Sequence, residues 1–351
     1  MIKRKKTRQI AVGEVKIGSN APVSVQSMTN TDTRDVEKTL DQIRQCAAHG
    51  CDIIRVALPD MKAVEALPKI LDESPIPVIG DIHFDHTLAI KAIEKGVNGI
   101  RINPGNIGSS DKVKKIIDAA RQAHIPIRIG VNAGSLEKDI KKKYSVTADA
   151  LVESALRHVR FFESQNFYNI KLSLKASSVP LTIEAYRKIS EKCYFPLHLG
   201  ITEAGTAFSG TIRSSIGIGT LLAEGIGDTI RVSLADDPVE EVKVGLELLR
   251  ALDLRKGPHL IVCPTCGRTE IDIISIAKEV EKEVRKLHIE KNISIAVMGC
   301  VVNGPGEAEE ADVGIAGGKG QAVLFKKGKI VRKISEQQII SELLKEIRSI
   351  L

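Results

Sequence analysis

The chain has no tryptophan, and aromatic residues make up only 3% of its 351 positions. Proteins that bind single-stranded nucleic acid without sequence preference stack the bases on aromatic side chains, so this scarcity argues against that function. Lysine and arginine nevertheless outnumber aspartate and glutamate by 51 to 44. An anionic small molecule accounts for this excess of positive charge, and we expect no nucleic-acid partner.

Long apolar runs are also missing. The basic N-terminus MIKRKKTRQIAVG is not followed by the apolar stretch of about 7–15 residues that a signal peptide needs, and no run of about 18 apolar residues occurs. The sequence therefore predicts a cytoplasmic protein with no membrane partner. Six cysteines are too few for a disulfide scaffold in a chain of this length, so a clustered pair indicates a metal or redox site.

From Pro22 to about Leu252 the chain repeats a short β-branched apolar run, a longer stretch with helical periodicity and a turn. We count eight units, with strands expected at about 23–28, 51–57, 76–82, 97–103, 125–131, 168–174, 196–201 and 227–233. Eight such units predict a (β/α)8 TIM barrel, with a doubly wound open sheet as the alternative. The segment RQIAVGEVKIG before the first unit is expected to form a hairpin that plugs the lower end of the barrel.

After the short polar stretch LDLRKGP the alternation of one strand and one helix ends, and a different order of expected elements begins. A strand, a CxxC turn, a long helix, a second strand, a Gly-rich loop, a hairpin around FKKGK and a last helix follow. We therefore expect two domains, a barrel over residues 1–254 and a small α/β domain over residues 255–351.

Polar and mostly cationic residues follow the expected barrel strands. They are Gln26, Arg55, Asp81, His83, Arg101, Asn103, Arg128, Asn132, Lys171 or Lys175, Thr202, Glu203, Arg231 and Ser233. Barrel enzymes place their chemistry at this end of the strands. A single loop arginine is more often a salt bridge at the rim, but four at equivalent positions form a strong anion trap. We infer a substrate with more than one phosphate.

Three acid/base groups, Asp81, His83 and Glu203, fall in the same layer and are candidates to donate or position a proton. For Asp81 a purely structural hydrogen-bond network is an equal alternative. His198 lies inside an expected buried strand, so we interpret it as a hydrogen-bonded core histidine, or one that supports the site residues from behind, rather than a catalyst.

The cysteines form one sequence cluster and one distant addition. Cys263 and Cys266 share the CPTCGR turn, and Cys300 ends another apolar run in MGCVVNGPGE. The NGPG turn can bring Glu307, the last residue of that stretch, back toward these thiols. Three thiolates and one exchangeable carboxylate suit an iron–sulfur cluster. A structural zinc site and a thioredoxin-like dithiol remain alternatives. Cys46, Cys51 and Cys193 read as small buried hydrophobes.

With these two motifs stand VQSMTNTDT, GDIHFD, RINPGN, RIGVNAGS, LSLKAS, LGITEAG and RVSLADDP. Over essentially its whole length the sequence resembles the 4-hydroxy-3-methylbut-2-enyl diphosphate synthase family in its bacterial two-domain form. The resemblance implies a [4Fe-4S] cluster held by Cys263, Cys266, Cys300 and Glu307. It implies that the substrate diphosphate is held by Arg55, Arg101, Asn103, Arg128, Asn132, Lys175, Arg231 and Ser233, and it prefers Lys175 to Lys171.

The resemblance also implies the reaction, a two-electron reductive ring opening of 2-C-methyl-D-erythritol 2,4-cyclodiphosphate in the non-mevalonate isoprenoid pathway. It places Asp81, His83, Thr202 and Glu203 near the reacting carbons, and we expect Glu203 to supply a proton. Electrons would arrive singly from ferredoxin or flavodoxin. Rival interpretations are a phosphate-binding barrel with a structural zinc module and a barrel that binds a pterin-like cofactor.

The connector predicts the quaternary structure. The eighth helix, about 15 residues and ~22 Å long, returns the chain to the end of the barrel opposite the chemistry. The seven residues of LDLRKGP span at most ~25 Å, which hardly returns a domain over its own barrel. We therefore expect a homodimer in which each cluster domain completes the partner's active site in trans.

Overall fold

The computed structural model describes residues 2–287, 289–300 and 308–351. The chain divides into a first unit that ends at Arg255 and a second that begins at Lys256, one residue after the boundary expected from the sequence. Each unit is described by itself. In the described ranges, no helix combines the length and the apolar character that a membrane span requires.

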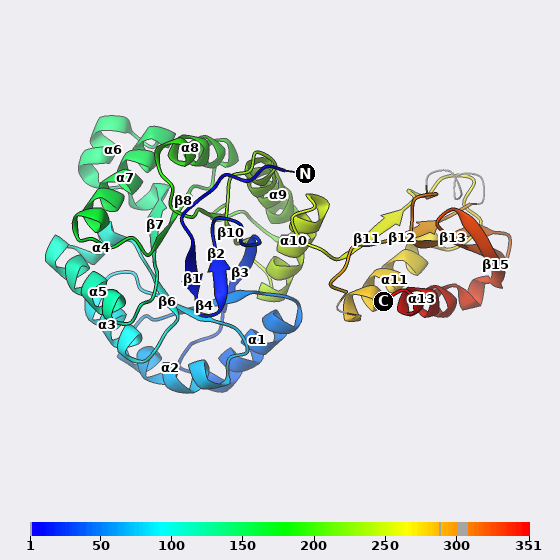
Figure 1. Ribbon diagram of the computed structural model, residues 1–351, viewed down its shortest axis with the longest axis horizontal. Coiled ribbons are helices and arrows are strands. Elements are labelled where there is room, and N and C mark those ends of the chain that lie inside the picture. The colour runs from blue at the N-terminus through cyan, green and yellow to red at the C-terminus, as the bar shows by residue number, and fades with distance from the viewer. Residues whose placement is uncertain (1, 288, 301–307) are drawn as a thin grey trace. The chain divides into compact units, whose positions relative to one another are not determined.

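Eight parallel strands form the core of the first unit (Figure 1). They are β3 (Ser24–Met28), β4 (Ile53–Ala57), β5 (Val78–Asp81), β6 (Gly99–Ile102), β7 (Ile127–Asn132), β8 (Ile170–Lys175), β9 (His198–Leu199) and β10 (Thr229–Ile230). Their order is β8-β7-β6-β5-β4-β3-β10-β9, and a single bridge between Leu172 and Leu197 joins β8 to the segment before β9. The expected TIM barrel is confirmed. We call the two ends of the barrel the amino end, where strands begin, and the carboxyl end, where they finish.

The junction between β8 and β9 has a side-chain reinforcement. Tyr186 is fully buried, and its hydroxyl donates a hydrogen bond to the carbonyl of His198 (2.5 Å) and accepts one from the backbone N–H of Leu174 (3.1 Å). One tyrosine therefore links the two strands whose own backbone pairing is shortest.

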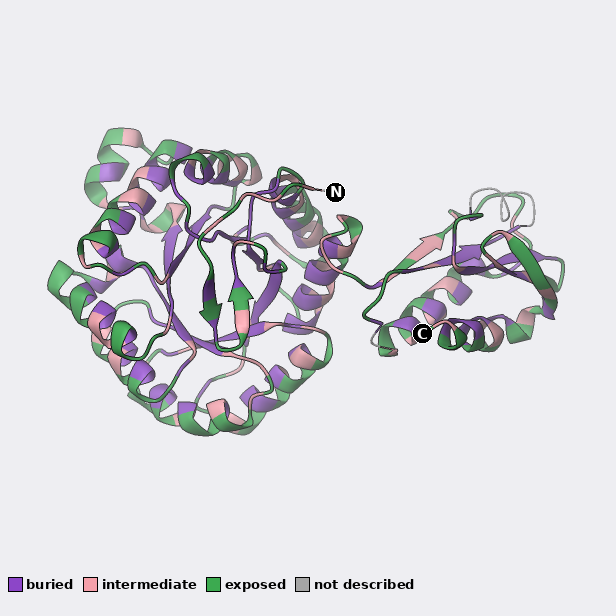
Figure 2. Ribbon diagram, in the orientation of Figure 1, coloured by how far each residue is buried: buried purple, intermediate pink, exposed green. Residues whose placement is uncertain are grey.

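Helices surround the strands, with buried residues on their inner faces and exposed residues outside (Figure 2). They are α1 (Val36–Ala48), α2 (Met61–Glu73), α3 (His86–Glu94), α4 (Pro104–Ile107), α5 (Ser110–Gln122), α6 (Lys138–Tyr144), α7 (Ala148–Ser164), α8 (Val179–Lys192), α9 (Ala207–Ala223) and α10 (Pro238–Ala251). Short 3₁₀ turns occur at Ala133–Ser135 and Glu336–Gln338. This pattern is the amphipathic arrangement that the helical periodicity predicts.

The loops after the strands end in residues that start the next helix. Asp60 accepts a hydrogen bond from the N–H of Ala63, and Asp237 accepts one from that of Val239, with Pro238 at the first helical position. A side-chain oxygen at this point satisfies one of the free N–H groups of the first turn. The sequence thereby sets where these two loops at the carboxyl end of the barrel stop.

An antiparallel hairpin of β1 (Ile10–Val12) and β2 (Val15–Ile17) precedes the barrel. Its apolar side chains pack with Ile53 and Ile79, which belong to β4 and β5. Gly13 turns with φ +53° close to Pro77, just before β5 begins. The hairpin therefore covers the amino end of the barrel, which confirms the expected plug.

The basic segment before the hairpin is tied to the same end. Arg4 forms a salt bridge with Asp228 (3.0 Å), and Thr7 donates a hydrogen bond to the same carboxylate (3.0 Å). The N–H of Lys5 bonds to the carbonyl of Gly225, and that of Arg8 to the carbonyl of Tyr194. Side-chain and backbone hydrogen bonds together hold this segment against the amino end of the barrel.

The second unit is a five-stranded sheet with the order β11-β12-β13-β14-β15. The strands are β11 (Pro258–Val262), β12 (Ile293–Met298), β13 (Val313–Gly318), β14 (Gln321–Lys326) and β15 (Lys329–Ser335), and the helices are α11 (Ile273–Lys286) and α13 (Ile339–Ser349). β11, β12 and β13 run parallel, whereas β14 and β15 form antiparallel pairs. Both helices contribute to one apolar core with the sheet. A separate small α/β unit is therefore present, as the change in the order of expected elements predicts.

The connection between the units starts at the amino end of the barrel. After α10 the chain reaches Arg255, whose guanidinium bonds both oxygens of Asp52 (2.7 and 3.0 Å), directly before β4. The carboxylate of Asp52 also accepts a hydrogen bond from the N–H of Val25 (2.7 Å). Arg255 is thus fixed to the barrel three residues before β11 begins.

Candidate active site

The expected cations lie inside the carboxyl half of the barrel. In the strand pairing, Asp81 of β5 stands beside Arg101 of β6, and Arg101 stands beside Arg128 of β7. Arg55, Arg101, Arg128 and Lys175 are all buried, and Arg231 directly follows β10. The structure therefore brings together the four arginines expected at strand ends and Lys175, the lysine that the family resemblance preferred.

Asp81 is the carboxylate at the centre of one half of this group. It accepts from Arg101 Nη1 at 3.2 Å, and Arg55 Nε and His83 Nε2 lie 3.6 and 3.5 Å away. Burial alone would raise the pKa of Asp81, but Arg55, the His83 hydrogen bond and Arg101 outweigh burial and hold it well below its usual range. Asp81 is therefore a fixed anion that orients cations.

Glu241 of α10 plays the same part for Arg231, and sequence reasoning missed it. Its carboxylate lies 3.3 Å from both Arg231 Nε and Nη2. It also accepts from Ser27 Oγ (2.9 Å) and from the N–H of Leu234 (3.0 Å). The signal was present in the sequence, because Glu241 falls on the buried stripe of its helix with Pro238 and Gly245.

The remaining cations are not neutralised. Arg128 and Lys175 have no carboxylate partner within 4.0 Å in the part of the chain that the structure describes. Burial, and then the neighbouring cations, lower the pKa values of both side chains. Burial also lowers the pKa of Arg55 to about 10, although Asp81 opposes it. An incoming dianion would relieve this mutual repulsion, so the cluster has the charge that suits an anionic ligand.

Two glycines make room for these long side chains. A Cβ on Gly130 would stand 2.8 Å from Arg101 Nε, and a Cβ on Gly200 would overlap Lys175 Nζ and lie 2.7 Å from the carbonyl of Arg231. Any side chain at either position would displace a cation. Neither glycine was predicted as part of the site.

Polar and sulfur atoms complete the inner wall. Asn103 Nδ2 donates to Ser135 Oγ (2.8 Å), and Asn132, with its amide oriented so that Oδ1 faces β6, accepts from Arg101 Nη2 (3.2 Å). Met28 Sδ lies 2.9 Å from Arg55 Nη2 and 3.7 Å from Arg231 Nη1. The thioether separates two guanidinium groups without adding charge.

Thr202, Glu203 and Ser233 also lie beyond strand ends, but their side chains make no hydrogen bond to the described residues. Glu203 is exposed and adopts φ +52°, a left-handed conformation that is uncommon outside glycine. Such conformations concentrate at functional sites. The structure thus leaves these three side chains free at the mouth.

Two further buried groups lie on the inside of the barrel. Lys171 pairs in register with Arg128, and His198 Nδ1 lies 3.1 Å from Thr229 Oγ1. The other ring nitrogen of His198 has no partner among the described residues, so only Nδ1 is hydrogen-bonded there. Burial lowers the pKa of His198 well below its usual range, and nearby cations add to this shift.

The cysteines of the second unit lie at the ends of neighbouring strands. Cys263 follows β11, Cys300 lies two residues beyond β12, and these strands pair in parallel with Val262 beside Val297. The N–H of Gly299 donates to Cys263 Sγ (3.2 Å). Hydrogen bonding by the N–H of Arg268 lowers the pKa of the exposed Cys266 thiol. Two of the three predicted thiol ligands are therefore brought to one edge of the sheet.

The set of ligands is incomplete in the described structure. Glu307, the expected fourth ligand, lies outside the described residues. Over residues 2–287, 289–300 and 308–351, no three His, Cys, Asp or Glu side chains are gathered tightly enough to hold a metal ion. Cys46, Cys51 and Cys193 are buried and free, as expected.

Comparison with known proteins identifies the family. Residues 7–246 match the model of the GcpE TIM-barrel domain, and residues 259–349 match that of the GcpE protein C-terminal domain. A protein of Caldanaerobacter subterraneus subsp. tengcongensis is 61% identical over 350 residues, covering 99% of this chain and 98% of the relative. One of Geobacter sulfurreducens is 60% identical over 348 residues, with the same coverage. Both are named 4-hydroxy-3-methylbut-2-en-1-yl diphosphate synthase (flavodoxin).

Solved structures show the fold alone. The dihydropteroate synthase of Xanthomonas albilineans aligns with a TM-score of 0.50 and 11% identity, over 71% of this chain and 99% of that one. This likeness covers the barrel fold and carries no information on ligand. On the two domain matches and the close relatives, the chain belongs to the GcpE family of 4-hydroxy-3-methylbut-2-en-1-yl diphosphate synthases.

Proposed function

We propose that the chain catalyses the two-electron reductive ring opening of 2-C-methyl-D-erythritol 2,4-cyclodiphosphate to 4-hydroxy-3-methylbut-2-enyl diphosphate, with loss of one oxygen as water. The observation that carries this proposal is the cluster of the buried Arg55, Arg101, Arg128 and Lys175 with the partly buried Arg231, for which Asp81 and Glu241 are the carboxylate partners among the described residues. A cyclic diphosphate supplies the missing negative charge. The names of the close relatives supply the reaction.

The cations bind the diphosphate, and the polar residues at the mouth orient the carbon skeleton. Guanidinium groups that carboxylates already hold in place bind phosphate oxygens with little loss of side-chain freedom. Asn103, Asn132, Thr202 and Ser233 are hydrogen-bonding groups of the same rim. In this assignment Arg128 and Lys175 gain most from the substrate, because no described carboxylate pairs with either of them.

Glu203 is our proposed proton donor. Asp81 is held as a carboxylate by its cationic neighbours, so at neutral pH it positions Arg55 and Arg101 and donates no proton. His83 lies 3.2 Å from Arg101 Nη1 and can orient the substrate from the same side. Glu203, exposed and without a hydrogen bond to the described residues, is the remaining one of the three predicted acid/base groups.

We propose that Cys263, Cys266, Cys300 and Glu307 hold a [4Fe-4S] cluster. Three soft thiolates suit this group, and the pairing of β11 with β12 brings Cys263 next to Gly299 and Cys300. When bound, the cluster passes electrons to the substrate one at a time. Flavodoxin, which the names of the relatives give, is the proposed electron donor, with ferredoxin as the alternative.

We further propose a homodimer whose active sites form in trans. Arg255 is fixed at the amino end of the barrel, and only two residues separate it from β11. On α9, Phe208, Ile212 and Ile216 are 81%, 44% and 53% exposed and recur every four residues, so they form one apolar stripe on the helix. This stripe starts beside the carboxyl end of the barrel and fits a second copy of the chain.

One experiment tests the function. Protein purified without oxygen is assayed for iron, sulfide and zinc, and then given the cyclic diphosphate with reduced flavodoxin. We expect iron and sulfide at about four atoms each per chain and formation of the linear allylic diphosphate. A colourless protein with one zinc per chain, or a cluster-loaded protein that binds but never opens the ring, contradicts the proposal.

A further inference from the structure

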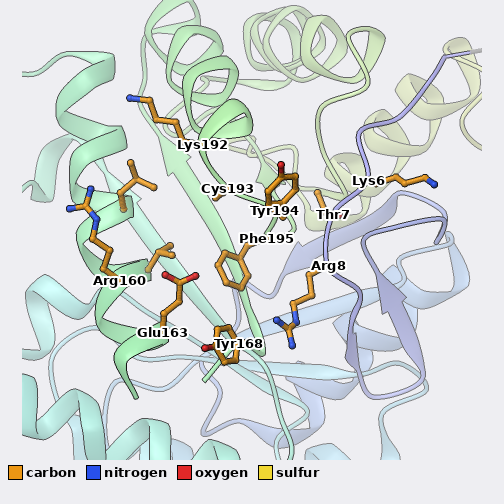
Figure 3. A pocket seen from close by; sticks show the side chains of 12 residues that line it. Lys6, Thr7, Arg8, Arg160, Glu163, Tyr168, Lys192, Cys193, Tyr194 and Phe195 are labelled. Carbon is orange, nitrogen blue, oxygen red and sulfur yellow. The ribbon is translucent and has the colours of Figure 1, made fainter. Parts of the chain in front are cut away.

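The amino end of the barrel carries a groove that the proposed reaction does not use (Figure 3). It lies between the basic N-terminal segment, the ends of α7 and α8, and the residues that precede β8 and β9. Its volume is about 710 Å³, within the range of roughly 300–1,000 Å³ that is typical of small-molecule sites. Because parallel strands all point the same way, this groove lies at the opposite end from the candidate active site.

The floor of the groove is apolar. Leu156, Val159 and Phe195 line it, and Figure 3 shows the ring of Phe195 between Arg160 and Glu163 on one side and Arg8 on the other. Among the uncharged polar side chains of the lining, Thr7 Oγ1 already bonds Asp228 and the N–H of Ser19, which leaves the hydroxyls of Tyr168 and Tyr194 for a ligand. Such a floor suits a hydrocarbon better than a sugar or a nucleobase.

The rim of the groove is cationic. Lys6, Arg8, Arg160 and Lys192 surround it, with Glu163 as the one acid in the lining. Arg160 pairs weakly with Glu153 at 3.5 Å, whereas Lys6 and Lys192 have no carboxylate within 4.0 Å in the described ranges. This rim attracts an anion and leaves ammonium groups available to bind it.

The aromatic side chains hold part of the rim in place. The Arg8 guanidinium lies 4.8 Å from the centre of the Tyr168 ring, and Lys5 Nζ lies 5.7 Å from that of Tyr194. A cation over a ring face is stabilised there and keeps its N–H edges for a ligand. The backbone bond from Arg8 to Tyr194 and the salt bridge of Arg4 with Asp228 fix the segment that brings these cations. The groove is therefore preorganised on both sides.

We propose that this groove binds an amphipathic organic phosphate, with the hydrocarbon part on Leu156, Val159 and Phe195 and the phosphate or diphosphate at Lys6, Arg8 and Lys192. The site is separate from the catalytic one and does not depend on the proposed reaction. It also gives a role to the basic N-terminus, which the candidate active site leaves unused.

The test is calorimetric titration of the cluster-loaded protein with geranyl diphosphate, in the presence of saturating cyclic diphosphate to fill the catalytic site. We expect one binding event per chain. Arg8→Glu and Lys192→Glu should each raise its dissociation constant at least about tenfold. Lys16→Glu, an exposed reversal on β2 of the same end, and Arg231→Ala, in the catalytic site, should leave it unchanged.

Further arms separate the other occupants. Inorganic pyrophosphate should bind more weakly, because it has no apolar part, and ADP more weakly than geranyl diphosphate. The proposal is overturned if geranyl diphosphate does not bind wild-type protein, if Arg8→Glu and Lys192→Glu bind it as wild type does, or if ADP binds more tightly. It is also overturned if sedimentation shows that these two variants split a dimer, since the groove is then a subunit interface. Turnover is measured in the same samples, so failure of the proposed reaction is recognised separately.

Discussion

The ammonium group of Lys175 occupies the space that a side chain on Gly200 would take. Gly200→Ala should therefore push Lys175 out of the anion site and press on the carbonyl of Arg231, 2.7 Å from the new Cβ. We expect the substrate dissociation constant to rise by about ten- to a hundredfold, the loss typical of a contact to a charged group. Isothermal titration with the cyclic diphosphate measures it.

Gly219→Ala is the matched control for that change. Gly219 lies inside α9, and nothing stands within 4 Å of a Cβ placed on it. Alanine there should leave binding unchanged and stabilise the helix by up to about 1 kcal/mol. Equal binding by wild-type and Gly200→Ala proteins would remove Lys175 from the substrate site.

Arg231 and Glu241 should act as one unit. Arg231→Ala is expected to cost about 1.5–3 kcal/mol of substrate binding, because it removes a fork of charged donors. Glu241→Gln keeps the shape of the side chain but loosens its hold on Arg231, so it should weaken binding only while Arg231 is present. A double-mutant cycle on substrate affinity measures this coupling. Strictly additive effects would mean that Glu241 does not position Arg231.

Glu137 predicts how the barrel responds to acid. It accepts from Ser154 Oγ (2.7 Å) and lies 3.0 Å from His158 Nε2. Burial would raise the pKa of Glu137, but the hydrogen bonds from His158 and Ser154 outweigh it and lower the pKa from 4.5 to about 2. A carboxyl whose pKa falls on folding stabilises the protein above its unfolded pKa. This contribution should therefore be present at pH 7 and disappear between pH 4.5 and about pH 2.

The size of that effect is modest because Glu137 is only half-buried, and solvent screens it. We expect about 1–2 kcal/mol at pH 7, measured as the difference in urea unfolding between wild-type and Glu137→Gln iron-free proteins. The difference should shrink as the pH falls through this window. Ser154→Ala should lose part of the same stabilisation. A difference in unfolding free energy between wild-type and Glu137→Gln proteins that does not change with pH would contradict this role of Glu137.

The position of each cysteine predicts whether it is needed to bind iron. Cys300→Ala should lose iron and activity together, because Cys300 follows β12 beside the strand that leads to Cys263. Cys193→Ala is the control, since Cys193 is a buried thiol at the end of α8 in the other unit. Iron and sulfide analysis after anaerobic purification is the measurement. Comparable iron loss in both variants would show that the ligands were wrongly chosen.

The trans dimer predicts complementation. Arg231→Ala chains, which should bind substrate weakly, and inactive Cys300→Ala chains are mixed under conditions that exchange subunits. They should form dimers with one undamaged site and regain up to about half of the activity per mixed dimer. Ile212→Glu on α9 should reduce dimer formation in sedimentation velocity, whereas the exposed Lys16→Glu should not. Verified mixed dimers without activity, or an active monomer, would exclude the arrangement.

Much of this architecture was predictable because periodicity and strand ends are local signals. Eight apolar runs indicated the barrel, and the residues after them gave Arg55, Arg101 and Arg128, which the structure brings together. The pattern left Lys171 and Lys175 as alternatives, and the family resemblance preferred Lys175. The Ile10–Val12 and Val15–Ile17 hairpin was equally readable, since alternating apolar residues flank Glu14 and Gly13.

What escaped prediction depends on contacts between distant residues. Glu241 falls on the buried face of α10, but only the packing of that helix shows that its carboxylate meets Arg231, ten positions earlier. Gly130 and Gly200 look like ordinary strand glycines, and only the barrel closure places cations over them. The groove also needed the fold, because its cations come from the N-terminus, α7 and α8.

The Tyr186 hydroxyl, which joins Leu174 to His198, reinforces a junction between β8 and β9 that otherwise has one backbone bridge, between Leu172 and Leu197. With β9 and β10 only two residues long, this junction is where the barrel should open first in native-state hydrogen exchange. Leu174 precedes Lys175, and His198 lies two residues before Gly200, so each opening would also separate the lysine from the glycine that accommodates it. The lifetime of the binding site then depends on how often the junction between β8 and β9 opens. Because Tyr186 belongs to α8, that helix controls the opening.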